Sequence, residues 1–301
     1  ALSDSPAGAF ALGAIGGLYG DAMERDFAAL APAMAVRAAG RTVMPSRDAL
    51  AAAFPAAGAK VAVFVHGLCE TEAAWRLFAP RDGPATYGDR LRSDLGHTPV
   101  FLRYTSGLAV DESARRLDAL LEGLVAAWPV PVEEVLLMGH SLGGLVSVRA
   151  AARAERRGAD WVRALRHVVC LASPHHGAPL AKGVHAAAAA LARVPETRAF
   201  ARILELRSDA VRDLRLGSVE EVPFVSGVSY YALSATVTPD FGHPLGRAAG
   251  DLLVRRASAS GAGRRIPFEL DNRHDAGGLT HFHVLNDPGV YARIRAWLEP
   301  A

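Results

Sequence analysis

Short, almost wholly apolar runs recur along the chain, and longer segments with apolar residues at helical spacing lie between them. Such runs are typical of strands buried on both faces, and their alternation with helices predicts a parallel, doubly wound sheet. We therefore expect one α/β domain over residues 35–301. The predicted sheet strands cover residues 60–65, 99–103, 135–138, 167–171, 228–235 and 265–270.

Other segments complete the predicted organisation. Residues 1–34 have apolar side chains at helical spacing and predict an N-terminal helical extension, and residues 34–44 predict a short hairpin. The apolar stripe of residues 288–298 predicts a final amphipathic helix. An insertion at residues 178–222 separates two predicted strands and predicts two helices, which form either a mobile cap over a site or a static packed pair.

The most informative motif is Gly-His-Ser-Leu-Gly-Gly at residues 139–144, which follows a predicted strand and precedes a predicted helix. A serine in this context lies on a sharp turn at the carboxyl end of a sheet, above the amino terminus of a helix. Gly139 and Gly143 leave room for the backbone at that turn. The motif therefore predicts that Ser141 is a nucleophile.

A second motif lies at the end of the predicted strand 60–65, where His66 and Gly67 precede Leu68. Nucleophilic attack on a carbonyl group creates a negatively charged oxygen, which backbone N–H groups stabilise when they point at it. We assign these N–H groups to Leu68 and to Leu142, the residue after the nucleophile. Gly67 lets the backbone approach the substrate closely.

Two aspartates and two histidines are candidates for the groups that activate the serine. Asp240 and Asp251 follow the predicted strand 228–235, and His281 and His283 follow the last predicted strand. A neutral imidazole must accept the serine proton, and a carboxylate must hold that imidazole. Either acid and either histidine fits by position. The order of serine, acid and histidine is that of α/β-hydrolases, and differs from chymotrypsin and subtilisin.

Four segments resemble motifs of bacterial α/β-hydrolase esterases and true lipases: residues 139–144, 173–177, 250–254 and 281–286. The resemblance implies an α/β-hydrolase fold with a mostly parallel, doubly wound sheet and a helical cap insertion. It also selects among the open candidates, and implies a catalytic triad of Ser141, Asp251 and His281. The residues that it places beside the substrate are His66, Gly67, His140 and His175.

Two positions depart from the pattern of these lipases. Leu252 stands where they have a glycine after the triad aspartate. His283 stands where the calcium-dependent members have an aspartate that binds calcium. Because Ca²⁺ prefers oxygen ligands, we expect no calcium site here, and we expect no other metal or cofactor.

Net charge, apolar runs and cysteine content indicate which binding partners and which cellular compartment to expect. The formal net charge is +2, which favours neither nucleic acid nor a membrane surface. No apolar run reaches the roughly 18 residues that span a bilayer, and residues 7–20 lack the basic start of an intact signal peptide. Cys69 and Cys170 belong to segments on opposite sides of the nucleophile strand, so we expect two buried free thiols. This leans weakly towards a reducing, cytoplasmic compartment, and the sequence does not indicate an oligomeric state.

These predictions together describe a serine hydrolase that cleaves carboxylic esters of small molecules or lipids through an acyl-enzyme. An acyltransferase or a thioesterase could use the same triad, because the reactions differ in the leaving group or in the acceptor that attacks the acyl-enzyme. A hydrolase-fold binding protein would lack a member of the triad, whereas this sequence has candidates for all three.

Overall fold

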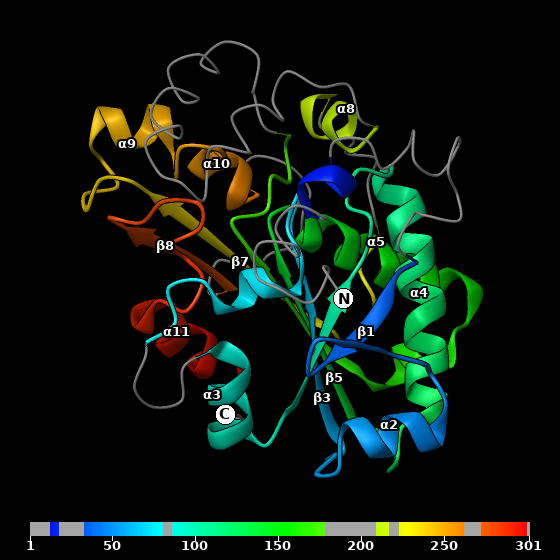
Figure 1. Cartoon of the computed structure of the whole chain (residues 1–301). Coiled ribbons are helices and arrows are strands. Elements are labelled where there is room, and N and C mark those ends of the chain that lie inside the picture. Colours follow the sequence, from blue (N-terminus) through cyan, green and yellow to red (C-terminus); the bar gives the residue numbers. More distant parts are fainter. Residues whose placement is uncertain are drawn as a thin grey trace.

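The computed structural model describes residues 13–17, 33–80, 86–177, 209–216, 223–261 and 272–299. Its centre is an eight-stranded sheet with the order β2-β1-β4-β3-β5-β6-β7-β8 (Figure 1). Strands β3 to β8 run parallel, and β1 pairs antiparallel with β2 and β4. The strands are β1 Ala35–Ala38, β2 Arg41–Val43, β3 Lys60–Val65, β4 Thr98–Arg103, β5 Glu134–His140, β6 Leu165–Leu171, β7 Ser229–Thr236 and β8 Arg273–Gly277.

Helices cover both faces of this sheet. In Figure 1, α4 and α5 lie on one side of the strands, and α3 and α11 lie on the other. The α-helices are α2 Arg47–Ala53, α3 Tyr87–Leu95, α4 Val110–Ala127, α5 Leu142–Arg157, α8 Asp209–Leu216, α9 Pro244–Ala249, α10 Arg256–Ala259 and α11 Pro288–Leu298. Two 3-10 helices are η2 Glu72–Arg76 and η3 Asp160–Ala164.

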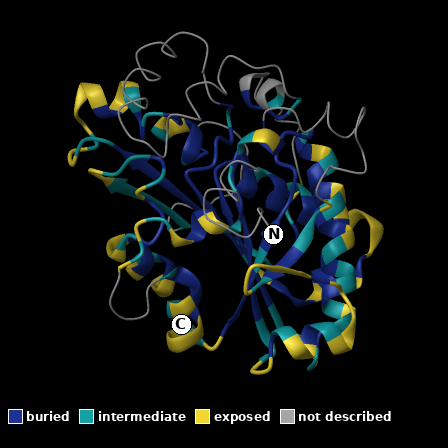
Figure 2. Ribbon diagram, viewed as in Figure 1, coloured by how far each residue is buried: buried dark blue, intermediate teal, exposed yellow. Residues whose placement is uncertain are grey.

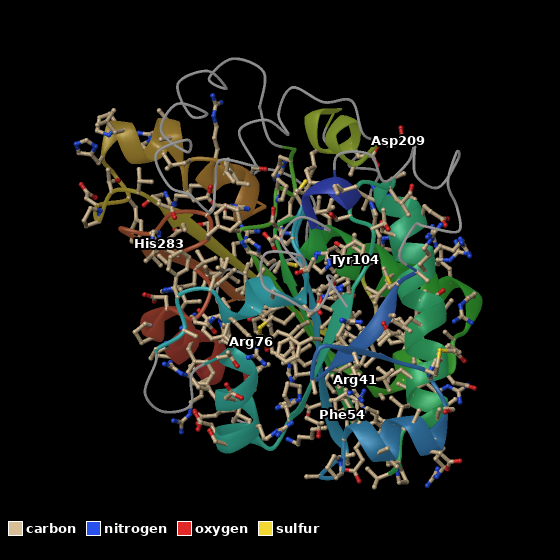
Figure 3. All side chains as sticks on the ribbon, viewed as in Figure 1. Arg41, Phe54, Arg76, Tyr104, Asp209 and His283 are labelled. Atoms are coloured by element: carbon tan, nitrogen blue, oxygen red, sulfur yellow. The ribbon has the colours of Figure 1, made fainter. Side chains whose placement is uncertain are left out.

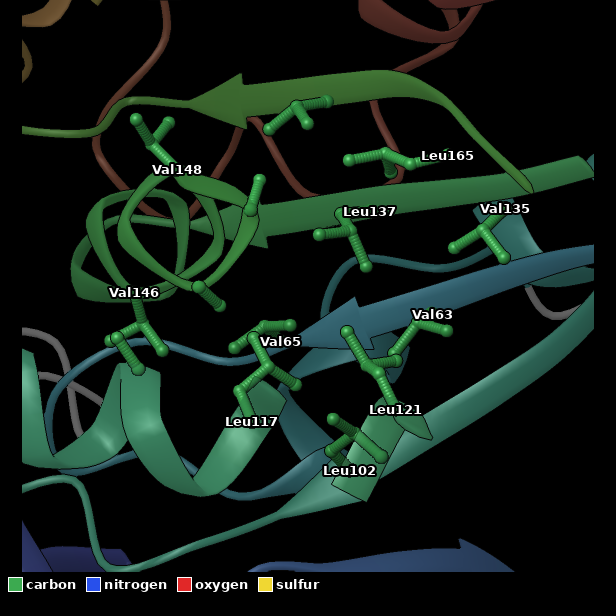
Figure 4. Close-up of a cluster of buried hydrophobic side chains, with 14 of the residues drawn as sticks. Val63, Val65, Leu102, Leu117, Leu121, Val135, Leu137, Val146, Val148 and Leu165 are labelled. Carbon is green, nitrogen blue, oxygen red and sulfur yellow. The ribbon is translucent and has the colours of Figure 1, made fainter. Parts of the chain in front are cut away.

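Alternate residues of the central strands supply two separate hydrophobic cores. Val63 and Val65 of β3 face α4 and α5, whereas Phe64 packs with η2, α3 and α11. Figure 4 shows the first core, in which Leu117 and Leu121 of α4 pack on strand valines and leucines. Burial on both faces explains why the central strands have continuous apolar sequences, and Figure 2 shows the sheet buried beneath exposed outer helix surfaces.

The sheet reverses its winding direction at β3. Strand β4 follows β3 and pairs on one side of it, and β5 then pairs on the other side. The connections that leave the carboxyl ends of β3 and β5 therefore diverge, which is where open α/β sheets bind their ligands. The predicted motifs at residues 66–68 and 139–144 lie at this point.

Most sequence predictions about secondary structure are confirmed. The central strands, the β1–β2 hairpin and α11 form where they were expected. The last strand differs: residues 265–270 lie outside the described residues, and β8 at Arg273–Gly277 pairs with β7. Most of the predicted extension 1–34 and of the insertion 178–222 also lies outside the described residues, apart from residues 13–17 and α8.

Helix α8 connects the end of the insertion to the main body. The carboxylate of Asp213 accepts a hydrogen bond of 2.9 Å from the backbone N–H of Val110, the first residue of α4. This acid supplies the cap that α4 lacks from its own flanking residue.

In the part of the chain that the structure describes, we find no helix with the length and apolar character needed to cross a membrane.

Candidate active site

The turn between β5 and α5 has the geometry expected of a nucleophile elbow. Ser141 adopts φ 52° and ψ −120°, an unfavourable conformation for a residue with a side chain. Its backbone N–H donates a hydrogen bond of 2.8 Å to the carbonyl oxygen of Leu171 in the adjacent strand β6. Ser141 itself is 8% exposed, so the surrounding structure holds this strained serine at the carboxyl edge of the sheet.

Close backbone packing explains the glycines of the motif. A Cβ atom on Gly143 would overlap the carbonyl oxygen of Val65 and would lie 2.6 Å from that of His66. A Cβ atom on Gly139 would lie 2.5 Å from the carbonyl oxygen of Gly143. The start of α5 therefore touches the end of β3, and this contact brings the two predicted motifs together.

Gly67 is the point where the loop after β3 meets the serine. A Cβ atom on Gly67 would lie 3.1 Å from the Cβ of Ser141. Leu68, the next residue, is buried, and so is Leu142 at the start of α5. The N–H of Leu142 has no acceptor within its helix, because the first N–H groups of a helix lack one. The structure thus places both predicted oxyanion residues beside the nucleophile.

A buried acid and a histidine lie side by side in the loops after β7 and β8. Nδ1 of His281 lies 2.8 Å from Oδ2 of Asp251, which has no exposed surface. The other carboxylate oxygen accepts hydrogen bonds from the N–H groups of Leu253 and Val254. The backbone N–H of His281 also donates to the carbonyl oxygen of Asp251, at 2.9 Å. A carboxylate oxygen accepts, so Nδ1 of His281 is the donor in this contact.

The residue after the acid lies in a turn of unusual geometry. Leu252 adopts φ 85°, a conformation that favours glycine. This conformation lets the next two N–H groups turn back onto Oδ1 of Asp251. The leucine therefore carries the strain of a side chain at positive φ, at a position where glycine would be unstrained.

The rejected candidates lie elsewhere. Asp240 is exposed, and its carboxylate accepts from the N–H of Gly242 within its own loop. His283 is also exposed; its Nδ1 lies 2.6 Å from the hydroxyl of Thr280, and its ring packs on Phe78 at 4.3 Å (Figure 3). The structure brings Asp251 and His281 together and leaves these two outside.

The contact of His66 with a substrate stays a prediction. Its side chain has no exposed surface and stacks on Tyr104, which is labelled in Figure 3, at 4.3 Å between ring centroids. Its Nε2 accepts from the N–H of Tyr104, and its Nδ1 donates to the carbonyl oxygen of Gly67. Burial lowers the pKa of His66, consistent with a neutral ring that supports the loop from behind.

The contact of His140 with a substrate also stays a prediction. This side chain is also fully buried, and its two ring nitrogens contact Glu70 and the backbone of His281. Glu70 is the main residue of this region that sequence reasoning missed. The only available signal was an acidic residue three positions after the His-Gly pair, and its partner lies 70 residues away.

His175 lies in the loop after β6 and is 6% exposed. Burial, with a smaller contribution from His176, lowers the pKa of His175 to about 3, so its ring is neutral in ordinary buffers. Its contact with a substrate stays a prediction, as does that of Gly67.

A short helical turn at residues 13–17 packs against the loop after β3. A Cβ atom on Gly13 would lie 2.8 Å from the carbonyl oxygen of Cys69, and one on Gly17 would overlap the thiol of Cys69. The carbonyl oxygen of Gly16 accepts a hydrogen bond of 3.0 Å from the N–H of Gly107. Glycine at these positions allows the turn to lie directly on the oxyanion loop.

Cys69 and Cys170 are both buried free thiols, as expected. Among the described residues, no group of three or more His, Cys, Asp or Glu side chains is arranged to hold a metal ion. The absence of a calcium site and of a cofactor stays a prediction.

The sheet order, the elbow and the acid–histidine pair at one edge define the class: the chain has the α/β-hydrolase fold. Residues 111–205 match the family model described as the PGAP1-like alpha/beta domain. These 95 residues include α4, β5, the elbow and β6. Comparison with curated protein sequences gives no significant match.

Several solved structures share this fold. The mature form of the Bacillus licheniformis lipase BlEst2 is 22% identical, with a TM-score of 0.56, over 80% of this chain and 92% of that chain. RedJ, a thioesterase from Streptomyces coelicolor, is 19% identical, with a TM-score of 0.52, over 81% of this chain and 94% of that chain. The Pyrococcus furiosus esterase PF2001 is 13% identical, with a TM-score of 0.50, over 80% and 81% of the two chains.

Proposed function

We propose that the protein is a serine hydrolase that cleaves carboxylic esters through an acyl-enzyme on Ser141. The observation that carries this proposal is the buried hydrogen bond between His281 and Asp251, at the same sheet edge as the strained serine. A carboxylate in this position fixes the imidazole tautomer and stabilises the imidazolium that forms when the serine loses its proton. The names of the structural neighbours, two of them a lipase and an esterase, support the same class.

Acylation follows from these roles. Oγ of Ser141 attacks the ester carbonyl while its proton passes to Nε2 of His281. The carbonyl oxygen becomes negative and accepts hydrogen bonds from the N–H groups of Leu68 and Leu142. The tetrahedral intermediate then breaks its bond to the alkoxy oxygen, which leaves as the alcohol after taking the proton from His281.

Deacylation repeats the sequence with water as the nucleophile. Nε2 of His281 accepts a proton from the water, whose oxygen bonds to the acyl carbon. The second tetrahedral intermediate releases the carboxylic acid and returns the proton to Ser141. The substrate class is a small-molecule or lipid ester, and a thioester would enter the same acylation step with a thiol as leaving group.

Hydrolysis of p-nitrophenyl esters from acetate to palmitate, measured below and above the micellar limit, tests this function. Ser141→Ala should lower kcat by about 10⁶-fold, as in serine hydrolases that lose their nucleophile. Ser147→Ala is the matched control, because Ser147 is buried in the same helix and its hydroxyl donates to the carbonyl oxygen of Gly143. This control should keep kcat within about threefold, since its hydroxyl does not face the reaction.

A fluorophosphonate probe locates the nucleophile independently of the substrate. It should label Ser141 in the wild-type protein and leave Ser141→Ala unlabelled, as judged by peptide mass spectrometry. Stoichiometric labelling of another serine would overturn the assignment. Faster turnover of thioesters than of matched oxygen esters, or transfer to added alcohols in preference to water, would replace the esterase with the related activity.

A further inference from the structure

Glu70 and His140 form a buried acid–histidine contact behind the candidate active site. Oε1 of Glu70 lies 2.8 Å from Nδ1 of His140. The His140 side chain has no exposed surface, and that of Glu70 is 7% exposed. Glu70 belongs to the loop after β3, and His140 is the residue before the nucleophile. None of the roles assigned above uses this pair.

Both ring nitrogens of His140 face acceptors. Nδ1 faces the carboxylate of Glu70, and Nε2 lies 3.0 Å from the carbonyl oxygen of His281. A neutral imidazole has a single N–H, so satisfying both acceptors requires the imidazolium. Burial alone would lower the pKa of His140, but the charge and the hydrogen bond of Glu70 outweigh it and raise that pKa. Burial likewise opposes ionisation of Glu70, but His140 and the N–H of Gly67 hold its pKa below the ordinary value.

The second oxygen of the acid reaches the oxyanion loop. Oε2 of Glu70 accepts a hydrogen bond of 2.7 Å from the N–H of Gly67, the residue before Leu68. The pair therefore connects three backbone segments: the loop that contains Gly67 and Leu68, the elbow at His140, and the loop that contains His281. The ring of His140 lies 4.8 Å from the ring of His281, so the whole contact lies next to the proposed base.

We propose that Glu70 and His140 form an ion pair that acts as a positioning device, setting the oxyanion N–H of Leu68 and the backbone of His281 relative to Ser141. This inference rests on the function proposed above. An oxyanion donor works only within hydrogen-bond distance of the position that the negative oxygen reaches in the transition state. An amide in place of the carboxylate has one acceptor oxygen for two donors, the N–H of Gly67 and the Nδ1–H of His140, so the loop shifts and the transition state is bound less tightly.

The chain contains a matched control, an acid–histidine contact that lies away from the candidate site. Nε2 of His97 lies 2.8 Å from Oε1 of Glu134, and these side chains are 1% and 16% exposed. Glu134 begins β5, whereas His140 ends it. Both pairs therefore join a glutamate to a buried histidine at 2.8 Å, and they lie at opposite ends of the same strand.

The first experiment compares Glu70→Gln with Glu134→Gln. We measure KM and kcat for a short p-nitrophenyl ester and the inhibition constant of a trifluoromethyl ketone, which forms an anionic tetrahedral adduct on the nucleophile. Glu70→Gln should lower kcat by about 10- to 100-fold and raise the inhibition constant of the ketone by a similar factor. KM should stay within about threefold, because the lost contact acts in the transition state. Glu134→Gln should leave all three within about threefold. Equal losses in the two variants, or a change in KM alone, would overturn the positioning role.

The second experiment needs neither a variant nor turnover. In the ¹⁵N NMR spectrum of the imidazole groups at pH 7, His140 should show two protonated nitrogens, and His66, whose pKa burial lowers, should show one. A single protonated nitrogen on His140 would overturn the ion pair. Because this signature is read from the free protein, it stands or falls separately from the proposed ester hydrolysis, which fails only if the wild-type protein turns over no ester.

Discussion

The two ends of strand β5 carry similar chemistry in different surroundings. At its start, Glu134 faces His97, with Lys60 at 3.3 Å and His167 at 3.9 Å, and the Lys60 side chain is 44% exposed. At its end, the Glu70–His140 contact is enclosed and bonds to the backbones of Gly67 and His281. At the amino end one carboxylate is shared among three basic side chains near solvent. At the carboxyl end each polar atom of the pair holds a loop of the candidate site.

Glycine packing shows the same contrast between the two ends. A Cβ atom on Gly58, just before β3, would lie 3.6 Å from its nearest neighbours, which is ordinary contact. A Cβ atom on Gly143 would overlap the backbone at the end of β3. The start of α5 therefore packs closely on the end of β3, at the edge of the sheet where the connections after β3 and β5 lead away in opposite directions. From the comparison of the two acid–histidine pairs, we expect such a pair to affect catalysis only where it bonds to the backbone of a loop in the candidate site.

The largest expected effect separates two histidines at the carboxyl end. His281→Ala should lower kcat by about 10⁶-fold and abolish the acylation burst, because the serine then has no base. His283→Ala should retain the burst and keep kcat within about tenfold, since its exposed ring only contacts Thr280 and Phe78. Pre-steady-state release of p-nitrophenol measures both, and a surviving burst in His281→Ala would reverse the assignment.

The next effect compares the acids. Asp251→Asn should lower kcat by about 10⁴-fold, because the amide favours the wrong tautomer of His281. Asp240→Asn, at an exposed loop, should keep kcat within about threefold. Steady-state kinetics on the two variants checks this, with circular dichroism to confirm that both are folded. A comparable loss in Asp240→Asn would break the distinction between the two acids.

A backbone test addresses the two ends directly. Gly143→Ala should destabilise the protein by about 3 kcal/mol or more, because the methyl group meets rigid backbone of β3. Gly58→Ala should change the free energy of unfolding by less than about 1 kcal/mol, because its methyl group has ordinary neighbours. Denaturant unfolding monitored by tryptophan fluorescence measures both. Equal destabilisation would show that the carboxyl end is no more tightly packed than the amino end.

The smallest effect is a difference in pH dependence. Burial opposes ionisation of Glu134, but His97 and its other basic neighbours lower its pKa from 4.5 to about 2. Its contribution to stability is therefore complete above pH 4.5 and disappears as the pH falls through about 2. The pKa of His140 is raised from 6.5, so its contribution is complete below pH 6.5 and disappears as the pH rises through the raised value.

Melting curves from acid to alkaline pH read out this difference. The gap in Tm between wild type and Glu134→Gln, roughly 3 °C for about 1 kcal/mol, should close only on the acid side. The gap between wild type and Glu70→Gln should also close on the alkaline side. Parallel curves for the two variants would mean that His140 is not held as an imidazolium.

The sequence was sufficient where local rules decide the structure. Continuous apolar runs located the central strands because both faces of those strands are buried. The elbow was found because a serine at positive φ between close backbones leaves a glycine pattern. The positive φ of Leu252 was not predictable from the residue itself, because such a conformation normally favours glycine.

Tertiary contacts decided what the sequence missed. Strand β8 is a polar segment at the sheet edge. The last strand was predicted at residues 265–270 instead, because those residues have the apolar pattern that β8 lacks. Glu70 could not be paired with His140 from the sequence, because the pairing of β3 with β5 brings them together. The burial of His66 and His140 could not be predicted from the sequence either, because packing between separate segments encloses both side chains.

The helical turn at residues 13–17 gives the protein a chemical reporter of its own local opening. The thiol of Cys69 lies beneath this turn, and burial, with a smaller contribution from Glu70, raises its pKa, so the closed form reacts slowly with alkylating reagents. Cys170 lies in the middle of the sheet, where only disruption of β6 exposes it. When opening and closing are fast, the two alkylation rates measure two free energies, one for lifting the turn and one for unfolding the core. The rate at Cys69 then measures how stably the turn packs on the oxyanion loop, and the rate at Cys170 gives the reference for the core.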